Sequence, residues 1–190
     1  MNLHDLISRT RSVRRFREDR PVDRETLLAL IDLARLSPSG GNRQGLRFFL
    51  AADPALNETI FQHLAWAGYL DGWDGPAPGE RPAAYIVVCH DTERAGRVGS
   101  DHGIAAWSIC LGAAERELGA CIIGSIDREA LAGALQLDAR YHILLVVALG
   151  EPAERVVLET TDPEHGIRYW RDENGVHHVP KRPLDELVLP

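Results

Sequence analysis

The chain has 190 residues, a formal net charge of −7 at pH 7, 45% hydrophobic residues and 26% charged residues. This length suits one domain with a substantial core, and the composition is that of an ordinary globular protein. The absence of a long apolar run disfavours a membrane span, and the first residues lack the pattern of a signal peptide. We therefore expect a cytoplasmic protein that binds neither membranes nor nucleic acid. Its three cysteines are expected to be small core residues: Cys89, Cys110 and Cys121.

Hydrophobic spacing and turn residues predict the elements in the first half of the chain. Asp23 can cap a helix whose apolar residues recur at helical spacing, and Ser37 followed by a proline ends it. A strand is expected over residues 47–52, a helix that begins with proline over residues 54–65, and an apolar strand over residues 83–89. This part of the chain therefore alternates helices and strands.

The second half begins with a helix, over residues 102–118, that is apolar on nearly every side. Such a helix must be buried, and in a domain of this size a partner subunit is a natural cover. A short segment at residues 120–125 leads to a helix capped by Asp127. Residues 141–149 are almost continuously hydrophobic, which predicts a strand covered on both faces.

The composition changes after Gly150, because residues 151–190 are polar and have few apolar runs. A segment of this kind is not expected to form its own core. It could lie along the body, wrap a partner or stay disordered. We therefore expect residues 1–150 to form the core domain and residues 151–190 to be an extension of the same domain.

A basic run near the N-terminus stands out in this acidic chain. Guanidinium groups match phosphate oxygens bidentately, and a hydroxyl between them can donate a further bond, so the run predicts a phosphate site. A solvated helix end or turn explains the run equally well, whereas a basic arm for nucleic acid is disfavoured by the acidic remainder of the chain. Six arginines lie within twelve residues: Arg9, Arg11, Arg14, Arg15, Arg17 and Arg20.

Large rings alternate with glycines over residues 66–76. Three of them, Trp66, Tyr69 and Trp73, are candidates for a mobile flap over a ligand. An aromatic loop packed on the core is an equally good reading of the same residues. The sequence alone leaves both possibilities open.

The common nucleotide and metal motifs are missing. There is neither a Gly-x-Gly-x-x-Gly turn nor a phosphate loop of the triphosphate-binding kind. Histidines at 165, 177 and 178 lack the ligand spacing of known metal sites, so we interpret them as exposed tail residues and expect no metal. The pairs His90–Asp91 and Asp101–His102 are weak ion candidates, and no Ser-His-Asp or Cys-His set is apparent.

Three motifs occur in one order along the chain: Arg-Ser-x-Arg-x-Phe from Arg11, Ser-Pro-Ser-x-x-Asn-x-Gln from Ser37, and Leu-Gly-x-Cys-x-Ile-Gly from Leu118. Together they resemble the nitroreductase family of FMN-dependent oxidoreductases, over almost the full length. The resemblance implies an α+β, three-layer fold with a mixed, mainly antiparallel sheet flanked by helices. It also implies an obligate two-fold homodimer in which the C-terminal tail wraps the partner.

The resemblance places the flavin residue by residue. It implies that the first motif binds the FMN phosphate and that the Ser-Pro-Ser loop lies beside the isoalloxazine ring, commonly from the other subunit. The third motif would offer backbone amides near the reactive N5, and a C-terminal basic pair would complete the phosphate site. The residues so implied are Arg11, Ser12, Arg14, Pro38, Ser39, Asn42, Gln44, Ile123, Gly124, Ser125, Lys181 and Arg182.

Two departures from the family pattern concern these motifs. Thr10 stands where many members carry an arginine, which leaves Arg9 or Lys181 to supply that charge. Gly45 and Leu46 follow Gln44, where the family usually has a proline and a bulky residue. This second departure predicts a looser loop at the ring.

The function that the resemblance implies is an FMN-dependent NAD(P)H oxidoreductase. It would reduce flat acceptors, nitroaromatic or quinone-like, by ping-pong hydride transfer through flavin N5, and no side chain would need to act as acid or base. Two alternatives stay open: a different flavin reaction on the same scaffold, and a non-catalytic flavin-binding protein.

Overall fold

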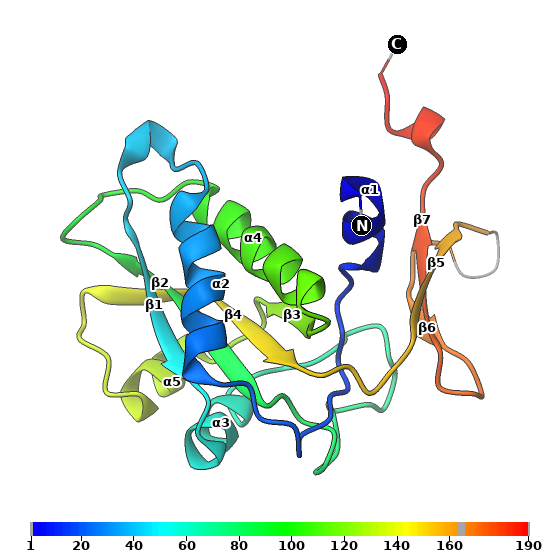
Figure 1. Cartoon of the computed structure of the whole chain (residues 1–190), viewed down its shortest axis with the longest axis horizontal. Coiled ribbons are helices and arrows are strands. Elements are labelled where there is room, and N and C mark those ends of the chain that lie inside the picture. The colour runs from blue at the N-terminus through cyan, green and yellow to red at the C-terminus, as the bar shows by residue number, and fades with distance from the viewer. Residues whose placement is uncertain (1, 163–165, 190) are drawn as a thin grey trace.

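The computed structural model describes residues 2–162 and 166–189. Its centre is a four-stranded sheet in the order β1-β2-β4-β3 (Figure 1). The strands are β1 (Leu46–Ala51), β2 (Ala84–Asp91), β3 (Gly119–Ile123) and β4 (Tyr141–Gly150). These four strands pair antiparallel with one another, and a parallel bridge joins Ser12 to Ala120 at the β3 edge, so the sheet is mainly antiparallel, as expected.

Side chains alternate across the sheet and build a separate apolar core on each face. On β2, Ile86 and Val88 face α2 (Arg24–Leu36) and α4 (Asp101–Glu115). Their neighbours Tyr85 and Val87 face α3 (Pro54–Phe61) and α5 (Arg128–Ala134). This period of two on a strand buried on both faces gives the predicted three-layer α+β fold (Figure 1).

The arginine run is extended rather than helical. It follows α1 (Leu3–Arg9) and lies along the edge strand β3, where the Val13 N–H donates to the Ala120 carbonyl at 2.9 Å. Phe16 is completely buried. Two paired glycines make room for this segment, since a Cβ on Gly119 would lie 2.9 Å from the Val13 side chain and one on Gly150 would lie 3.0 Å from the Phe16 ring.

The C-terminal segment forms a small second sheet. Its strands are β5 (Val156–Thr160), β6 (Trp170–Arg171) and β7 (His177–Lys181), in the order β5-β7-β6, and β5 pairs with β7 in parallel. Two 3₁₀ turns complete the described elements: η1 (Gly40–Asn42) in the loop after α2, and η2 (Leu184–Glu186) near the C-terminus. In Figure 1 the small sheet stands beside α1, beyond the edge of the main sheet.

Two predicted helices end earlier than expected. The helix expected over residues 54–65 ends at Phe61, because Leu64 bridges to Ile126 and the Ala65 N–H donates to the Ser125 carbonyl at 2.9 Å. The helix expected to reach residue 118 ends at Glu115. Among the described residues, no helix is long and apolar enough to cross a membrane.

Candidate functional site

An open groove with an empty volume of about 730 Å³ lies where the arginine run meets α4, β3 and the small sheet. We call it the arginine groove. Burial raises the pKa of Cys110 to about 12, so this thiol lines the groove as an apolar group. The lining residues are Thr10, Arg11, Ser12, Arg14, Trp107, Cys110, Ala120, Ile122, Tyr169, Val179 and Lys181.

The clustered arginines divide into two groups. Arg11 and Arg14 line the groove, and partial burial lowers the pKa of the Arg11 guanidinium. Arg15 instead pairs with Glu80 at 3.2 Å, and Arg17 lies 3.7 Å from a carboxylate oxygen of Glu151. The positions that line the groove are therefore the two that belong to the Arg-Ser-x-Arg motif.

Arg14 is held from several sides. Its Nη1 donates to Nε2 of His177 at 3.0 Å, and its guanidinium carbon lies 4.6 Å from the centroid of the Tyr169 ring. Its backbone N–H donates to Glu154, whose other carboxylate oxygen lies 2.9 Å from Nη2 of Arg171 on β6. The small sheet and the residues just before its strands β5 and β6 thus hold both the backbone and the side chain of Arg14.

A second groove, with an empty volume of about 910 Å³, lies at the Ser-Pro-Ser loop. We call it the loop groove. Apolar side chains from α2, β1 and α4 meet polar side chains from the loop, which suits a flat ring with a polar edge. The lining residues are Ile31, Ala34, Arg35, Ser37, Pro38, Ser39, Asn42, Gln44, Leu46, Arg47, Phe48, Asp101 and Ala105.

Asp101, at the start of α4, fixes the conformation of this loop. The Asp101 carboxylate accepts hydrogen bonds from the Ser39 hydroxyl at 2.8 Å and from the Gly40 N–H at 2.9 Å. Asp101 is only 8% exposed. Asn42 and Gln44 have φ values of 52° and 50°, which non-glycine residues seldom adopt and which occur often at functional sites. The loop therefore presents these two amides in a constrained conformation.

Gly45 lies where the loop packs closely on its neighbours, and the predicted looseness of the loop stays a prediction. A Cβ at this position would lie only 2.7 Å from the Cβ of Ala95, and the Gly45 carbonyl accepts from the Asp91 N–H at 2.9 Å. Thr10, the other departure, is 4% exposed and donates through its hydroxyl to the Leu6 carbonyl at 2.7 Å, so it caps the end of α1.

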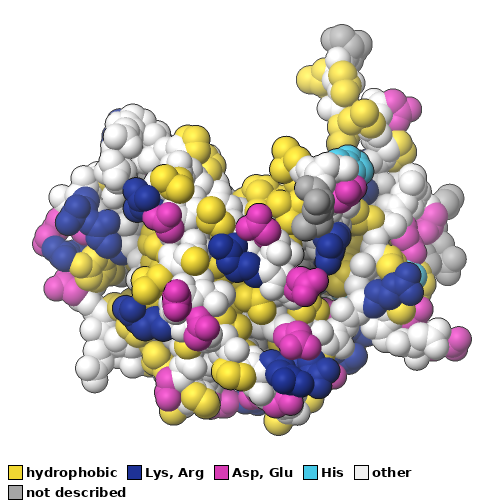
Figure 2. Space-filling model, viewed as in Figure 1, with side chains coloured by type: hydrophobic (Ala, Val, Ile, Leu, Met, Phe, Trp, Pro, Cys, Tyr) yellow, Lys and Arg dark blue, Asp and Glu magenta, His cyan; other side chains and the backbone are white. Residues whose placement is uncertain are grey.

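The two grooves lie apart on one chain and share none of the lining residues that the structure describes. Trp107 and Cys110 of α4 line the arginine groove, whereas Asp101 and Ala105 of the same helix line the loop groove. Large apolar side chains are exposed on the surface around them, and Figure 2 shows the surface hollowed between α4 and α1, with the C-terminal segment beyond α1. They are Leu3 and Ile7 on α1, Ile104 and Trp107 on α4, and Ile122 on β3.

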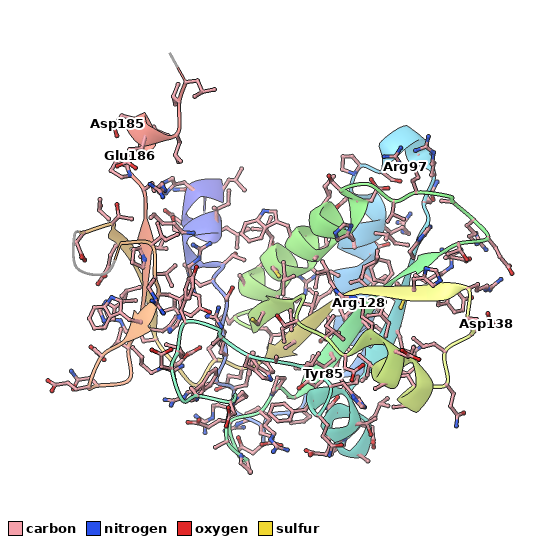
Figure 3. All side chains as sticks on the ribbon, turned by 180° about the vertical axis from the view of Figure 1, so that it is seen from behind. Tyr85, Arg97, Arg128, Asp138, Asp185 and Glu186 are labelled. Atoms are coloured by element: carbon pink, nitrogen blue, oxygen red, sulfur yellow. The ribbon has the colours of Figure 1, made fainter. Side chains whose placement is uncertain are left out.

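The third motif lies at the end of β3. Ile123 is a core residue, whereas Gly124 and Ser125 are exposed and do not line the arginine groove. Arg128 stabilises this turn, because its Nη2 donates to the Gly124 carbonyl at 3.0 Å and its Nε to the Ile143 carbonyl at 3.2 Å. Figure 3 shows Arg128 beside β3 and β4.

The three aromatic residues of the predicted flap occupy different environments. Trp66 is 8% exposed and belongs to the core, with its ring centroid 5.9 Å from that of Phe61, so it is not part of a mobile cover. Tyr69 lies 5.0 Å from the ring of Tyr169, and Trp73 lies 4.9 Å from the guanidinium carbon of Arg171. A flap role for the last two stays a prediction.

The C-terminal basic pair also divides. Lys181, at the end of β7, lines the arginine groove. Arg182 is exposed and pairs with Glu186 at 3.1 Å, and neither this side chain nor the segment around Asp185 contributes to the groove (Figure 3). The structure therefore brings Lys181, but not Arg182, to the Arg-Ser-x-Arg motif.

Sequence reasoning missed several residues that shape the site. His177, interpreted as an exposed tail histidine, is completely buried, and its neighbour His178 stacks on Trp170 with ring centroids 4.1 Å apart. The missing signal was the strand β7, whose period of two directs His177, Val179 and Lys181 to one side. The described residues contain no group of three potential metal ligands, and the Asp101 carboxylate accepts hydrogen bonds from the Ser-Pro-Ser loop.

Comparisons with known proteins agree with this architecture. No curated protein matches the chain. A solved structure from Desulfovibrio desulfuricans, described as a nitroreductase in complex with FMN, is 28% identical with a TM-score of 0.73, over 100% of this chain and 97% of that one. A nitroreductase family protein from Clostridium difficile is 20% identical with a TM-score of 0.71, over 100% and 98%, and shows the likeness in fold.

Most of the chain, including its main sheet, matches one protein family. The model of the nitroreductase family matches residues 7–69 and 78–151. These ranges include the arginine run, the Ser-Pro-Ser loop, all four strands of the main sheet and the helices that cover both of its faces. The chain belongs to the nitroreductase family.

Proposed function

We propose that this protein is an FMN-dependent NAD(P)H oxidoreductase whose flavin binds between two copies of the chain. The observation that carries the proposal is the division of the implied flavin residues between two grooves of one chain. The arginine groove offers cationic groups for a phosphate, and the loop groove offers apolar walls with an amide-lined edge for a ring. Each groove alone holds half of the groups that FMN requires.

The arginine groove fits the phosphate end of FMN. Arg11, Arg14 and Lys181 are three cations in a protein of net charge −7, and the Ser12 hydroxyl lies among them. Charge-assisted hydrogen bonds from such groups stabilise a phosphate dianion about twice as strongly as neutral ones. Trp107 and Ile122 supply the apolar surface that the remainder of the cofactor needs.

The loop groove fits the ring of a flavin held by the partner. Asn42 and Gln44 can both donate and accept, as the polar edge of the ring requires. Asp101 holds the loop in place, and Phe48 and Ile31 form its apolar wall. Bound FMN would supply two-electron transfer between a nicotinamide and a flat acceptor, and the chain's own residues bind it, orient it and exclude water.

A two-fold dimer would join an arginine groove from one copy to a loop groove from the other. The exposed apolar residues of α1 and α4 lie on the surface around the grooves and would be covered in such a pair. The end of the tail is also apolar and exposed, at Leu184, Leu187, Val188 and Leu189, which fits a tail that wraps the partner. The dimer and the flavin site are therefore parts of one proposal.

The visible absorption spectrum of the purified protein, before and after NAD(P)H, tests the cofactor and its reduction. Flavin that stays oxidised with NAD(P)H would favour the non-catalytic alternative. Arg11→Ala combined with Arg14→Ala should give folded protein that has lost FMN. The matched control is Arg15→Ala combined with Arg17→Ala, which removes two neighbouring arginines that pair with Glu80 and Glu151 and should keep the flavin.

Mixing two inactive variants tests the shared site. The Arg11/Arg14 double variant keeps its loop groove, and an Asn42→Ala, Gln44→Ala double variant keeps its arginine groove. A mixed dimer then contains one intact site, so activity should return when the two are unfolded and refolded together. No recovery in verified mixed dimers would show that one chain supplies both grooves of its own site.

A further inference from the structure

His177 is the one histidine of the described chain that is completely buried, and it lies directly behind Arg14. An arginine can only donate, so Nε2 of His177 accepts the hydrogen bond from Arg14 Nη1 at 3.0 Å. The ring is therefore neutral, with its proton on Nδ1. That Nδ1 is buried and has no hydrogen-bond partner in the described part of the chain.

The surroundings of His177 keep it neutral. Arg14 lies on one side of His177. Arg171 on β6 is the residue opposite His177 on β7, and His178 follows His177 in the chain. Its backbone N–H donates to the Arg155 carbonyl, and the nearby carboxylate of Glu154 is bound to Arg171 and to the Arg14 N–H. The ring of Tyr169 lies 5.2 Å from the imidazole. Burial, followed by the charge of Arg14, lowers the pKa of His177 to about 4.

We propose that His177 is a positioning residue that, as a neutral acceptor, holds the Arg14 guanidinium in the arginine groove for the phosphate of the cofactor. Tyr169 lies against the guanidinium, and Nη1 donates both to His177 and to the Ser12 carbonyl at 3.3 Å, which leaves the donors on Nε and Nη2 for a phosphate in the groove. The inference rests on the proposed function, because it presumes that a phosphate binds in this groove.

The geometry makes the contact sensitive to protonation. An imidazolium would present a donor and a positive charge to Arg14 at a distance of 3.0 Å, where an acceptor now stands. Because two like charges at this distance repel each other strongly, Arg14 would leave its position. The small sheet would thereby couple acidification to the strength of the phosphate site.

The test compares FMN with riboflavin, which has the same ring but no phosphate. Dissociation constants of both are measured by flavin fluorescence at pH 7 for the full chain and three variants. His177→Phe keeps the ring volume but removes the acceptor, His177→Gln keeps an acceptor that cannot be protonated, and His142→Gln changes an exposed histidine on β4. An arginine–phosphate hydrogen bond accounts for roughly 10- to 100-fold in affinity. His177→Phe should therefore raise the dissociation constant for FMN by roughly tenfold.

The expected pattern separates positioning from a general structural role. His177→Phe should leave riboflavin binding unchanged, His177→Gln should restore most of the FMN affinity, and His142→Gln should match the parent. Weakening of both ligands by His177→Phe would assign His177 a structural role and overturn the proposal. Unchanged FMN binding in that variant would overturn it as well.

A pH series supplies a second, independent readout. The phosphate of FMN itself titrates near pH 6, so the parent and His177→Gln are compared at each pH from 7 to 4. The parent should lose FMN affinity more steeply than His177→Gln as the pH approaches 4, and the curves for riboflavin should run parallel. Parallel curves for FMN would contradict the inference, whereas failure of the parent to bind FMN at pH 7 would contradict the proposed function itself.

Discussion

In the main sheet, β2 and β4 bury apolar side chains on both faces, whereas in the small C-terminal sheet β7 lies among polar and charged neighbours. The main sheet contacts two apolar clusters, one under α2 and α4 and one under α3 and α5. The contacts that join the small sheet to the body include the pair of Glu154 and Arg171, the bond between Arg14 and His177, and the Trp73 ring against the Arg171 guanidinium. We infer that burial of apolar surface stabilises the body and that specific polar contacts orient the small sheet.

A substitution in the apolar cluster under α2 and α4 should have the largest effect on stability. Leu30 is completely buried between α2 and the sheet, so Leu30→Ala removes apolar contacts and leaves a cavity. We expect the free energy of unfolding of the whole chain to fall by about 4 kcal/mol, measured by denaturant titration. Leu28→Ala on the same helix, where the side chain is 43% exposed, is the control and should change it by less than about 1 kcal/mol.

Breaking the ion pair between Glu154 and Arg171 should have the next largest effect on stability, confined to the small sheet. The side chains of Glu154 and Arg171 are 1% and 12% exposed, so Glu154→Ala leaves a largely buried cation without its partner. We expect a loss of about 3 kcal/mol in the local stability of β5 to β7, measured by hydrogen exchange, while the main sheet stays protected. Glu151→Ala, at the exposed pair with Arg17, is the control. Equal loss of protection in both sheets would show that they unfold as one unit.

Acidification should weaken the attachment of the small sheet through His177. In the unfolded chain a histidine titrates near pH 6.5, whereas burial and Arg14 lower the pKa of His177 to about 4 in the folded chain. The unfolded state therefore binds more protons between these values, and stability falls as the pH falls. From pH 6.5 to pH 5 this difference amounts to about 2 kcal/mol. His177→Gln should lack this part of the pH dependence in parallel denaturant titrations.

The contrast between the two sheets also explains which features were predictable. Strands with long apolar runs, such as β2 and β4, and helices with side-chain caps, such as α2 at Asp23, are determined by local sequence. The small sheet has no such pattern, because its strands are short and half polar. Its contribution to the arginine groove, through Tyr169 and His177, depends on contacts between residues far apart in the sequence.

The residues of the candidate site follow the same division. The motif at Arg11 to Arg14 and the loop at Ser39 to Gln44 were recognisable because they are contiguous in the sequence. The role of Asp101 was not, since only the packing of α4 against the loop brings its carboxylate to the Ser39 hydroxyl. The separation of the two grooves on one chain is likewise a property of the fold and not of either motif.

The smallest expected effect on stability concerns two adjacent exposed cations at the end of the small sheet. Lys181 lines the arginine groove, whereas Arg182 pairs with Glu186 one helical turn away. Because exposed pairs of this kind contribute little, Lys181→Ala and Arg182→Ala should each change the free energy of unfolding by less than about 0.5 kcal/mol. Their effects on FMN binding should differ. Lys181→Ala should raise the dissociation constant for FMN by roughly three- to tenfold, whereas Arg182→Ala should leave it unchanged. If both variants weaken FMN binding equally, the tail must take another path in the proposed dimer so that Arg182 also reaches the phosphate.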